Sequence, residues 1–194
     1  MSQTNDLNTS SKTRILVEGA MLIALAMILS MIKLYELPQG GSLTLEMLPL
    51  VIMGERHGAK WGCFTGFVHG LLQMFLGFSN VLYCQTLIAM IGCILLDYLL
   101  AFTVLGLSPL FSCRFKNRAA GLVMGGVICG LLRFACSFLS GWLLWGSYAW
   151  EGWNPALYSL VYNGSYMIPN IIILAIVIAI LAKAAPKLFP RVQE

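Results

Sequence analysis

Three ionisable side chains lie inside long apolar stretches of this sequence, where a charge is expensive. They are Glu18, Asp97 and Arg133. Near the centre of a membrane-spanning helix such a group costs roughly 2.5–3.5 kcal/mol on insertion scales. Such a group is tolerated where it is paired with an opposite charge or serves a ligand, so these three are the first candidates for chemistry.

Glu18 has a structural explanation close at hand. Arg14 lies four residues before it, about one helical turn away, and both are near the end of an apolar stretch. We expect the two to form an ion pair, with Arg14 extending towards water.

Asp97, in "CILLDYLLAF", and Arg133, in "GLLRFACSF", have no opposite charge within their own stretches. Two interpretations are open. The residues form an ion pair between facing helices and fix the bundle, or they line a cavity and serve a ligand. The interpretations are compatible, because a ligand can insert beside or between two paired charges.

Further polar and aromatic residues recur around these charges at helical spacing. Arg133, Ser137, Gly141 and Trp145 are four residues apart and so share one helix face. Each polar residue alone is most simply explained by a hydrogen bond between helices. Together they predict a pocket open to the outer side, with the further members Tyr98, His69, Gln73, Tyr158, Tyr162 and Asn163.

The segment "WGSYAWEGWNPALYSLVYNG" concentrates aromatic surface between two apolar stretches. Six of its twenty residues are Trp or Tyr, and Glu151 is its one charge. A belt at the membrane surface explains part of this, but not Asn163 or Gly141. Aromatic faces attract organic cations, and a carboxylate with an amide suits a ring carrying donors and acceptors. The residues predict a flat, cationic, nitrogen-rich ligand.

The elements that carry these residues are transmembrane helices. The chain is 59% hydrophobic and 10% charged, whereas soluble domains carry about 25% charged residues. We therefore expect an all-α integral membrane protein, one domain over residues 1–194, with six spans. The second span is short for a full crossing. The expected spans are about Arg14–Lys33, Ser42–Gly54, His57–Leu76, Leu82–Leu107, Ala119–Trp145 and Tyr158–Ala185.

Basic residues set the orientation of these spans. With six spans and both termini cytoplasmic, ten of the twelve Lys and Arg residues fall on the inner side, including Arg191, as the positive-inside rule requires. Residues 1–12 would form a polar cytoplasmic tail. The net charge of +4 then reflects topology and gives no support to nucleic-acid binding.

Several kinds of site find no support in the sequence. The string nearest to a phosphate-binding loop, "GERHGAKW", has the wrong glycine spacing and no Ser or Thr after Lys60. No nucleophile elbow or zinc-protease helix is present. The six cysteines include no C-x-x-C pair, so we expect free, packed thiols, no metal and no cofactor. We expect no enzyme activity.

The strings "LLDYLLAF", "GLLRF", "FLSGWLLWGSYAWEGW" and "ALYSLVYNGSY" resemble the thiamine-specific substrate-binding components of energy-coupling-factor (ECF) vitamin transporters. The likeness runs from about Arg14 to Pro190. It implies a bacterial, multi-pass cell-membrane protein that binds thiamine from outside. It also implies association with a transmembrane scaffold protein and two cytosolic ATPases, which would explain the missing phosphate loop.

The resemblance also implies roles for single residues. Asp97 would bond the aminopyrimidine, with Tyr98 beside it and Arg133 paired with the acid. Trp145 would stack on the thiazolium, while Tyr158 and Asn163 enclose the pyrimidine. Small residues on the first helix would pack on the scaffold. The other implied positions are Gly141, Ala20 and Ala24, with Ser137 where some relatives have His and Tyr35 in place of an outer-loop Trp.

Two other functions are compatible with these residues. One is the same class of transporter with another B-vitamin or a thiamine precursor as its ligand. The other is a small membrane enzyme or a channel, which would need a reactive group such as His69 facing the pocket.

Overall fold

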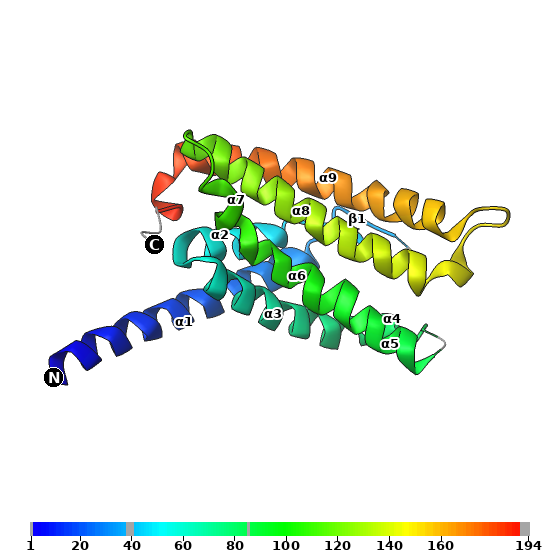
Figure 1. Cartoon of the computed structure of the whole chain (residues 1–194), viewed down its shortest axis with the longest axis horizontal. Helices are drawn as coiled ribbons and strands as arrows, with labels where there is room; N and C mark the ends of the chain where they lie inside the picture. Colours follow the sequence, from blue (N-terminus) through cyan, green and yellow to red (C-terminus); the bar gives the residue numbers. More distant parts are fainter. Residues whose placement is uncertain (1, 38–40, 85, 191–194) are drawn as a thin grey trace.

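The computed structural model describes residues 2–37, 41–84 and 86–190, with side chains from residue 12 onward, so Arg191 and all side chains of the predicted tail except that of Lys12 lie outside it. Long helices follow most of the predicted spans (Figure 1). The main ones are α1 (Ser2–Met31), α2 (Met47–His57), α3 (Ala59–Leu76), α8 (Arg118–Leu143) and α9 (Pro155–Ala184).

Among the described residues, four helical stretches are long and apolar enough to cross a membrane: Lys12–Met31, Leu87–Ser112, Arg118–Leu143 and Pro155–Ala184. They make the chain a helical, multi-pass membrane protein. The second expected span is different. Its helix α2 has 11 residues and reaches only about 16 Å, whereas the apolar core of a bilayer is about 30 Å thick.

The stretch Leu87–Ser112 is one continuous rod made of several helix types. It begins with α5 (Leu87–Cys93) and continues as the π-helical η1 (Ile94–Leu100), α6 (Ala101–Thr103), the 3₁₀-helical η2 (Val104–Leu107) and α7 (Ser108–Ser112). Single π turns are frequent at functional sites, and this one carries Asp97.

Glycines on α3 allow this rod to pack backbone against backbone. Gly62, Gly66 and Gly70 recur every four residues on one helix face. A Cβ at Gly66 would lie 2.4 Å from the carbonyl oxygen of Phe102, and one at Gly70 would lie 2.7 Å from that of Tyr98. Small residues at this spacing favour close helix approach in membranes.

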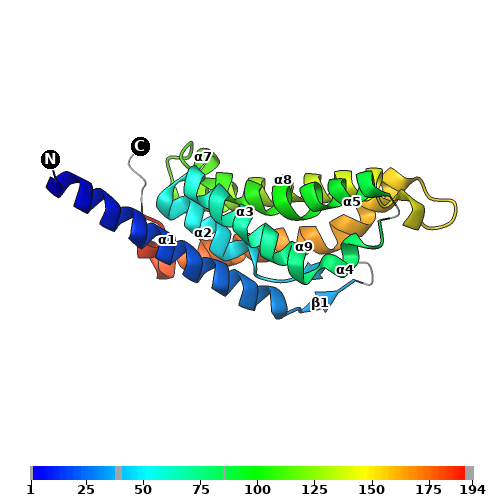
Figure 2. The same cartoon turned by 90° about the horizontal axis from the view of Figure 1, so that it is seen from below.

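A small hairpin departs from the all-α prediction. Strands β1 (Tyr35–Glu36) and β2 (Ser42–Leu43) pair antiparallel, with Tyr35 opposite Leu43. The expectation that a span begins at Ser42 is therefore wrong. The hairpin, α4 (Phe78–Val81) and η3 (Gly146–Tyr148) lie towards one end of the bundle, opposite the start of α1 and η4 (Pro186–Leu188) (Figure 2).

At the end of the bundle that holds η4, two basic residues join separate elements. Glu18 pairs with Arg56 (Nε to Oε1, 2.5 Å) and with His57, so the expected pair with Arg14 is not formed. The reason is tertiary, because α2 ends against α1 and brings both basic groups to Glu18. The buried Glu55 similarly pairs with Arg118, 3.0 Å away, and accepts hydrogen bonds from Ser108 and Ser112.

Candidate ligand-binding site

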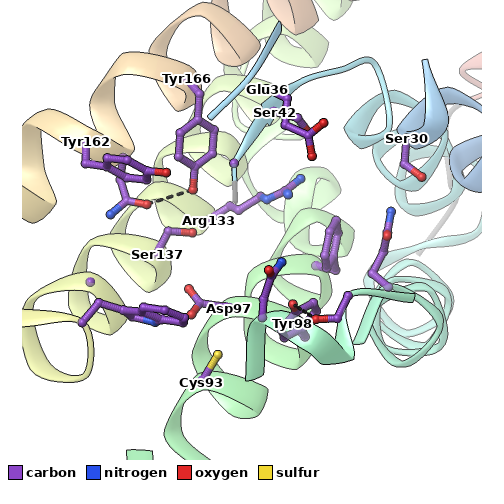
Figure 3. A pocket seen from close by; sticks show the side chains of 18 of the residues that line it. Ser30, Glu36, Ser42, Cys93, Asp97, Tyr98, Arg133, Ser137, Tyr162 and Tyr166 are labelled. Carbon is purple, nitrogen blue, oxygen red and sulfur yellow. Dashed lines mark hydrogen bonds between the residues drawn. The ribbon is translucent and has the colours of Figure 1, made fainter. Parts of the chain in front are cut away.

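A cavity of about 370 Å³ lies among α3, η1, α8, α9 and the hairpin. This volume suits a vitamin-sized molecule. In Figure 3, Tyr166 and Asp97 enter it from different walls, with Arg133 between them. Eight of the nine predicted ligand-binding residues line it, namely Asp97, Tyr98, Arg133, Ser137, Gly141, Trp145, Tyr158 and Asn163.

Arg133 does not pair with Asp97 as predicted. Its Nη2 lies 2.8 Å from Oε1 of Glu46, the residue just before α2. The guanidinium also lies over the ring of Phe102, 4.1 Å from the centroid. These contacts hold Arg133 on the side of the cavity where Glu46 and Phe102 lie, which explains why it leaves Asp97 to other partners.

Asp97 projects from the π-helical η1 and accepts a hydrogen bond from the Ser140 hydroxyl on α8. Its neighbour Tyr98 also lines the cavity and donates a hydrogen bond to the carbonyl oxygen of Gly77, 3.1 Å away. Within the described residues, Asp97 takes part in no ion pair with a basic side chain. The carboxylate is therefore available to a ligand.

The aromatic segment divides into pocket wall and exposed surface. Trp145 and Tyr148 line the cavity with their rings 5.6 Å apart, and Tyr158 and Tyr162 line it from α9 at the same separation. Trp150 and Trp153 do not line it; their side chains are 53% and 40% exposed. The segment thus contributes some of its aromatic residues to the cavity lining and leaves others exposed.

Gly141 fits the close approach of α8 and α9. A Cβ there would lie 2.3 Å from Ser159 Oγ and 2.9 Å from Asn163 Nδ2. Side chains of α9 therefore pack directly against this glycine. Asn163 is held in turn, since its Oδ1 accepts a hydrogen bond from the Tyr166 hydroxyl at 2.8 Å.

His69 lies behind the cavity wall and not on it. It is fully buried, packs edge-on against Phe102 with 4.7 Å between ring centroids, and its Nε2 lies 3.8 Å from Oε2 of Glu46. Gln73 does line the cavity and donates to Glu46 at 2.8 Å. His69 therefore supports Glu46 from behind the wall, and its imidazole does not face the cavity.

Sequence reasoning missed several lining residues, above all Glu46, Lys33, Glu36 and Tyr166. Glu46 lies inside the apolar string "LTLEMLPLVIM", so the criterion that selected Asp97 would also have found it. Tyr35 was expected to face the ligand, but its side chain is 60% exposed and is not part of the lining. Ala20 and Ala24 are exposed on α1.

The charges of the lining favour a monovalent cation. Three carboxylates and two basic side chains line the cavity, giving a net charge of −1 when all are ionised. Lys33 pairs with Glu36 and Arg133 with Glu46, so the unbalanced charge belongs to Asp97. An uncompensated carboxylate beside Trp145 is a natural partner for an aromatic cation.

Known proteins resemble this chain in both sequence and fold. The chain is 35% identical over 193 residues to the thiamine transporter ThiT of Bacillus subtilis, covering 94% of this chain and 97% of the relative. ThiT of Lacticaseibacillus paracasei is 29% identical over 187 residues, with 90% of each covered. The solved structure of ThiT from Listeria monocytogenes matches with a TM-score of 0.77 at 30% identity, covering 92% of this chain and 98% of that one.

These relatives are named as transporters, which agrees with the expectation that the chain is not an enzyme. Their names and the apolar helices make it a multi-pass protein of the cell membrane. A family model described as "Thiamine transporter protein" matches residues 16–190. The chain therefore belongs to the thiamine transporter protein family.

Proposed function

We propose that the chain binds thiamine from the outer side of the membrane and serves as the substrate-specific subunit of an ECF-type transporter. The observation that carries the ligand assignment is the unbalanced Asp97 carboxylate beside the Trp145 ring. Thiamine is a flat molecule with one fixed positive charge on its thiazolium ring and an aminopyrimidine that donates and accepts hydrogen bonds. Both halves match the lining.

The expected contacts divide the ligand between two walls. The amino group of the pyrimidine donates to Asp97, which at present accepts from Ser140. Asn163 and Tyr158, from α9, enclose the same ring. The thiazolium stacks on Trp145, and a desolvated cation on an aromatic face gains about 2 kcal/mol. His69 contacts Glu46, and Glu46 pairs with Arg133. In this proposal the three residues shape the site without contacting the positive charge of the thiazolium.

Support for the outward orientation comes from the distribution of charge. Arg56 and Arg118 lie at the end of the bundle that holds η4, because they donate to the backbone carbonyls of Lys187 and Pro190. The hairpin, whose residues line the cavity, lies towards the opposite end (Figure 2). Under the positive-inside rule the basic end is cytoplasmic. Six crossings with both termini inside, of which the second, α2, is short, belong to this proposal.

Energy must come from other subunits, since the sequence has no phosphate-binding loop. We assign this role to a transmembrane scaffold protein and two cytosolic ATPases. The exposed small residues Ala20 and Ala24 on α1 offer the scaffold a surface for close helix approach.

The test is a titration of the detergent-purified protein, followed by intrinsic Trp fluorescence. Thiamine should quench saturably at submicromolar concentration, and its pyrimidine precursor, thiamine monophosphate, riboflavin and biotin should compete more weakly. Tighter binding of one of those competitors would move the assignment to that ligand. No response to any of them in folded protein would contradict a vitamin-binding role.

A further inference from the structure

Asn170 on α9 has a buried side chain that lies outside the cavity and yet contacts one of its walls. The residue is 5% exposed and is absent from the lining. Its Oδ1 accepts a hydrogen bond from the Thr44 backbone N–H at 2.9 Å, and its Nδ2 donates to the Ser42 carbonyl oxygen at 2.8 Å. One amide group thus satisfies both a donor and an acceptor of the chain around β2.

The hairpin that Asn170 holds is too small to hold itself. Its ladder pairs Tyr35 with Leu43 and Glu36 with Ser42, and β1 is exposed. An isolated two-stranded hairpin is marginal in stability at best. Its position must therefore be fixed by contacts with the helices, and β2 packs against α9.

The same hairpin forms part of the cavity. Glu36, Gly41 and Ser42 are lining residues, and Glu46, which fixes Arg133, follows two residues after Thr44. A displacement of β2 would therefore move a wall of the site and the start of α2 together.

A second contact of the hairpin with α9 fixes it from the side. Gly41 has φ of +87°, and a Cβ there would lie 2.6 Å from the ring of Tyr166. The backbone thus passes directly over that ring, at a conformation that favours glycine. Tyr166 in turn bonds Asn163, so a chain of contacts connects the hairpin with a ligand-facing amide.

We propose that Asn170 is a positioning residue that sets the lifetime of the bound ligand by holding the hairpin wall against α9. This inference rests on the proposed thiamine binding for its functional readout. Loss of the two hydrogen bonds leaves the buried Thr44 N–H and the half-buried Ser42 carbonyl without these partners, and each bond is worth about 0.5–1.5 kcal/mol. The wall then loosens, while the groups that contact the ligand stay unchanged.

The test compares Asn170→Ala with Asn170→Asp in the full-length, detergent-purified protein. The Asp variant keeps an acceptor for the Thr44 N–H but places a carboxylate oxygen against the Ser42 carbonyl oxygen, so it should loosen the hairpin at least as much as the Ala variant does. Ser165→Ala is the matched control, because Ser165 is exposed on α9 and bonds only the Tyr162 carbonyl among the partners seen.

Stopped-flow fluorescence should show thiamine dissociating roughly 5- to 150-fold faster from Asn170→Ala, the range expected for two lost hydrogen bonds, with a similar association rate. Hydrogen–deuterium exchange of the ligand-free protein should rise in residues 41–46 and stay unchanged in α8. A merely structural role would instead raise exchange throughout the bundle.

Exchange in residues 41–46 that equals the wild type, or thiamine dissociation unchanged in folded Asn170→Ala, would overturn the proposal. The exchange readout needs no ligand, so it judges the anchoring even where wild-type protein fails to bind thiamine. Such a failure would count against the proposed function alone.

Discussion

Arg133 on α8 is paired with Glu46 at the start of α2, with 2.8 Å between Nη2 and Oε1, and no basic side chain in the described part of the chain forms an ion pair with Asp97. This arrangement separates two tasks. The Glu46–Arg133 pair joins α2 to α8 inside the bundle, and under the proposed function Asp97 supplies the negative charge that meets the cation.

Replacing Glu46 with Gln should destabilise the protein by about 3–5 kcal/mol, the cost of leaving one member of a buried ion pair alone. Glu36→Gln breaks a pair that is 41% and 56% exposed, and such surface pairs are worth about 0–1 kcal/mol. Thermal unfolding in detergent measures both. Equal melting temperatures for the two variants would show that the Glu46 pair has no structural role.

Asp97→Asn should weaken thiamine binding roughly 10- to 100-fold, because hydrogen bonds with a charged partner are worth about 1.5–3 kcal/mol. The fold should persist, since the amide oxygen can still accept from Ser140. Calorimetric titration gives the dissociation constant. Glu151→Gln is the control, an exposed carboxylate of the aromatic segment that does not line the cavity, and it should bind as the wild type does.

Trp145→Ala should remove most of the thiamine-induced fluorescence quenching and weaken binding roughly 5- to 30-fold, as expected for a lost cation–aromatic contact. Trp153→Ala removes a Trp that lies outside the lining and should leave the dissociation constant unchanged. Quenching that survives in Trp145→Ala and disappears in Trp153→Ala would place the ligand in the outer loop.

Gly141→Ala should lower both affinity and stability, since its Cβ would meet Ser159 Oγ at 2.3 Å and push α9 away from α8. Gly164→Ala offers a matched control in a helix, where the nearest contact is Ile168 Cδ1 at 3.7 Å. There the change should stabilise by about 0.5–1 kcal/mol through helix propensity. Melting temperatures that move in the same direction would argue against close packing at Gly141.

The pair of exchanges Ala20→Trp and Ala24→Trp should leave thiamine binding intact and reduce uptake at least roughly ten-fold, because bulky side chains prevent close helix approach. Uptake of labelled thiamine is measured in cells that supply the scaffold and ATPases. Ile176→Trp, at an exposed site on α9, controls for bulk in the lipid-facing surface. Normal uptake by the double variant would place the scaffold contact elsewhere.

Much of the fold was predictable because apolar length is a strong signal. The helices Arg118–Leu143 and Pro155–Ala184 lie within three residues of their expected spans, whereas Leu87–Ser112 begins and ends five residues later than expected. Most pocket residues on these helices were predictable as well, since four-residue spacing determines which side chains share a face. The hairpin was not, because two-residue strands leave no pattern in a sequence.

Partners were harder to predict than positions. Glu18, Arg133 and Asp97 were each recognised as unusual, yet their contacts with Arg56, Glu46 and Ser140 join residues far apart in the sequence. Which charges meet depends on how the helices cross, and local spacing says nothing about this. The placement of His69 behind Phe102 follows from the same tertiary packing.

The π-helical turn around Asp97 changes the phase of its helix. A π turn holds one residue more than an α-helical turn, and each residue of an α-helix advances the direction of its side chain by about 100°. Side chains that follow Ile94–Leu100 therefore point in directions that are rotated about the helix axis, relative to those that a continuous α-helix would give. A single-residue deletion there would restore α-helical winding, rotate the carboxylate away from Ser140 and turn it towards lipid or a neighbouring helix.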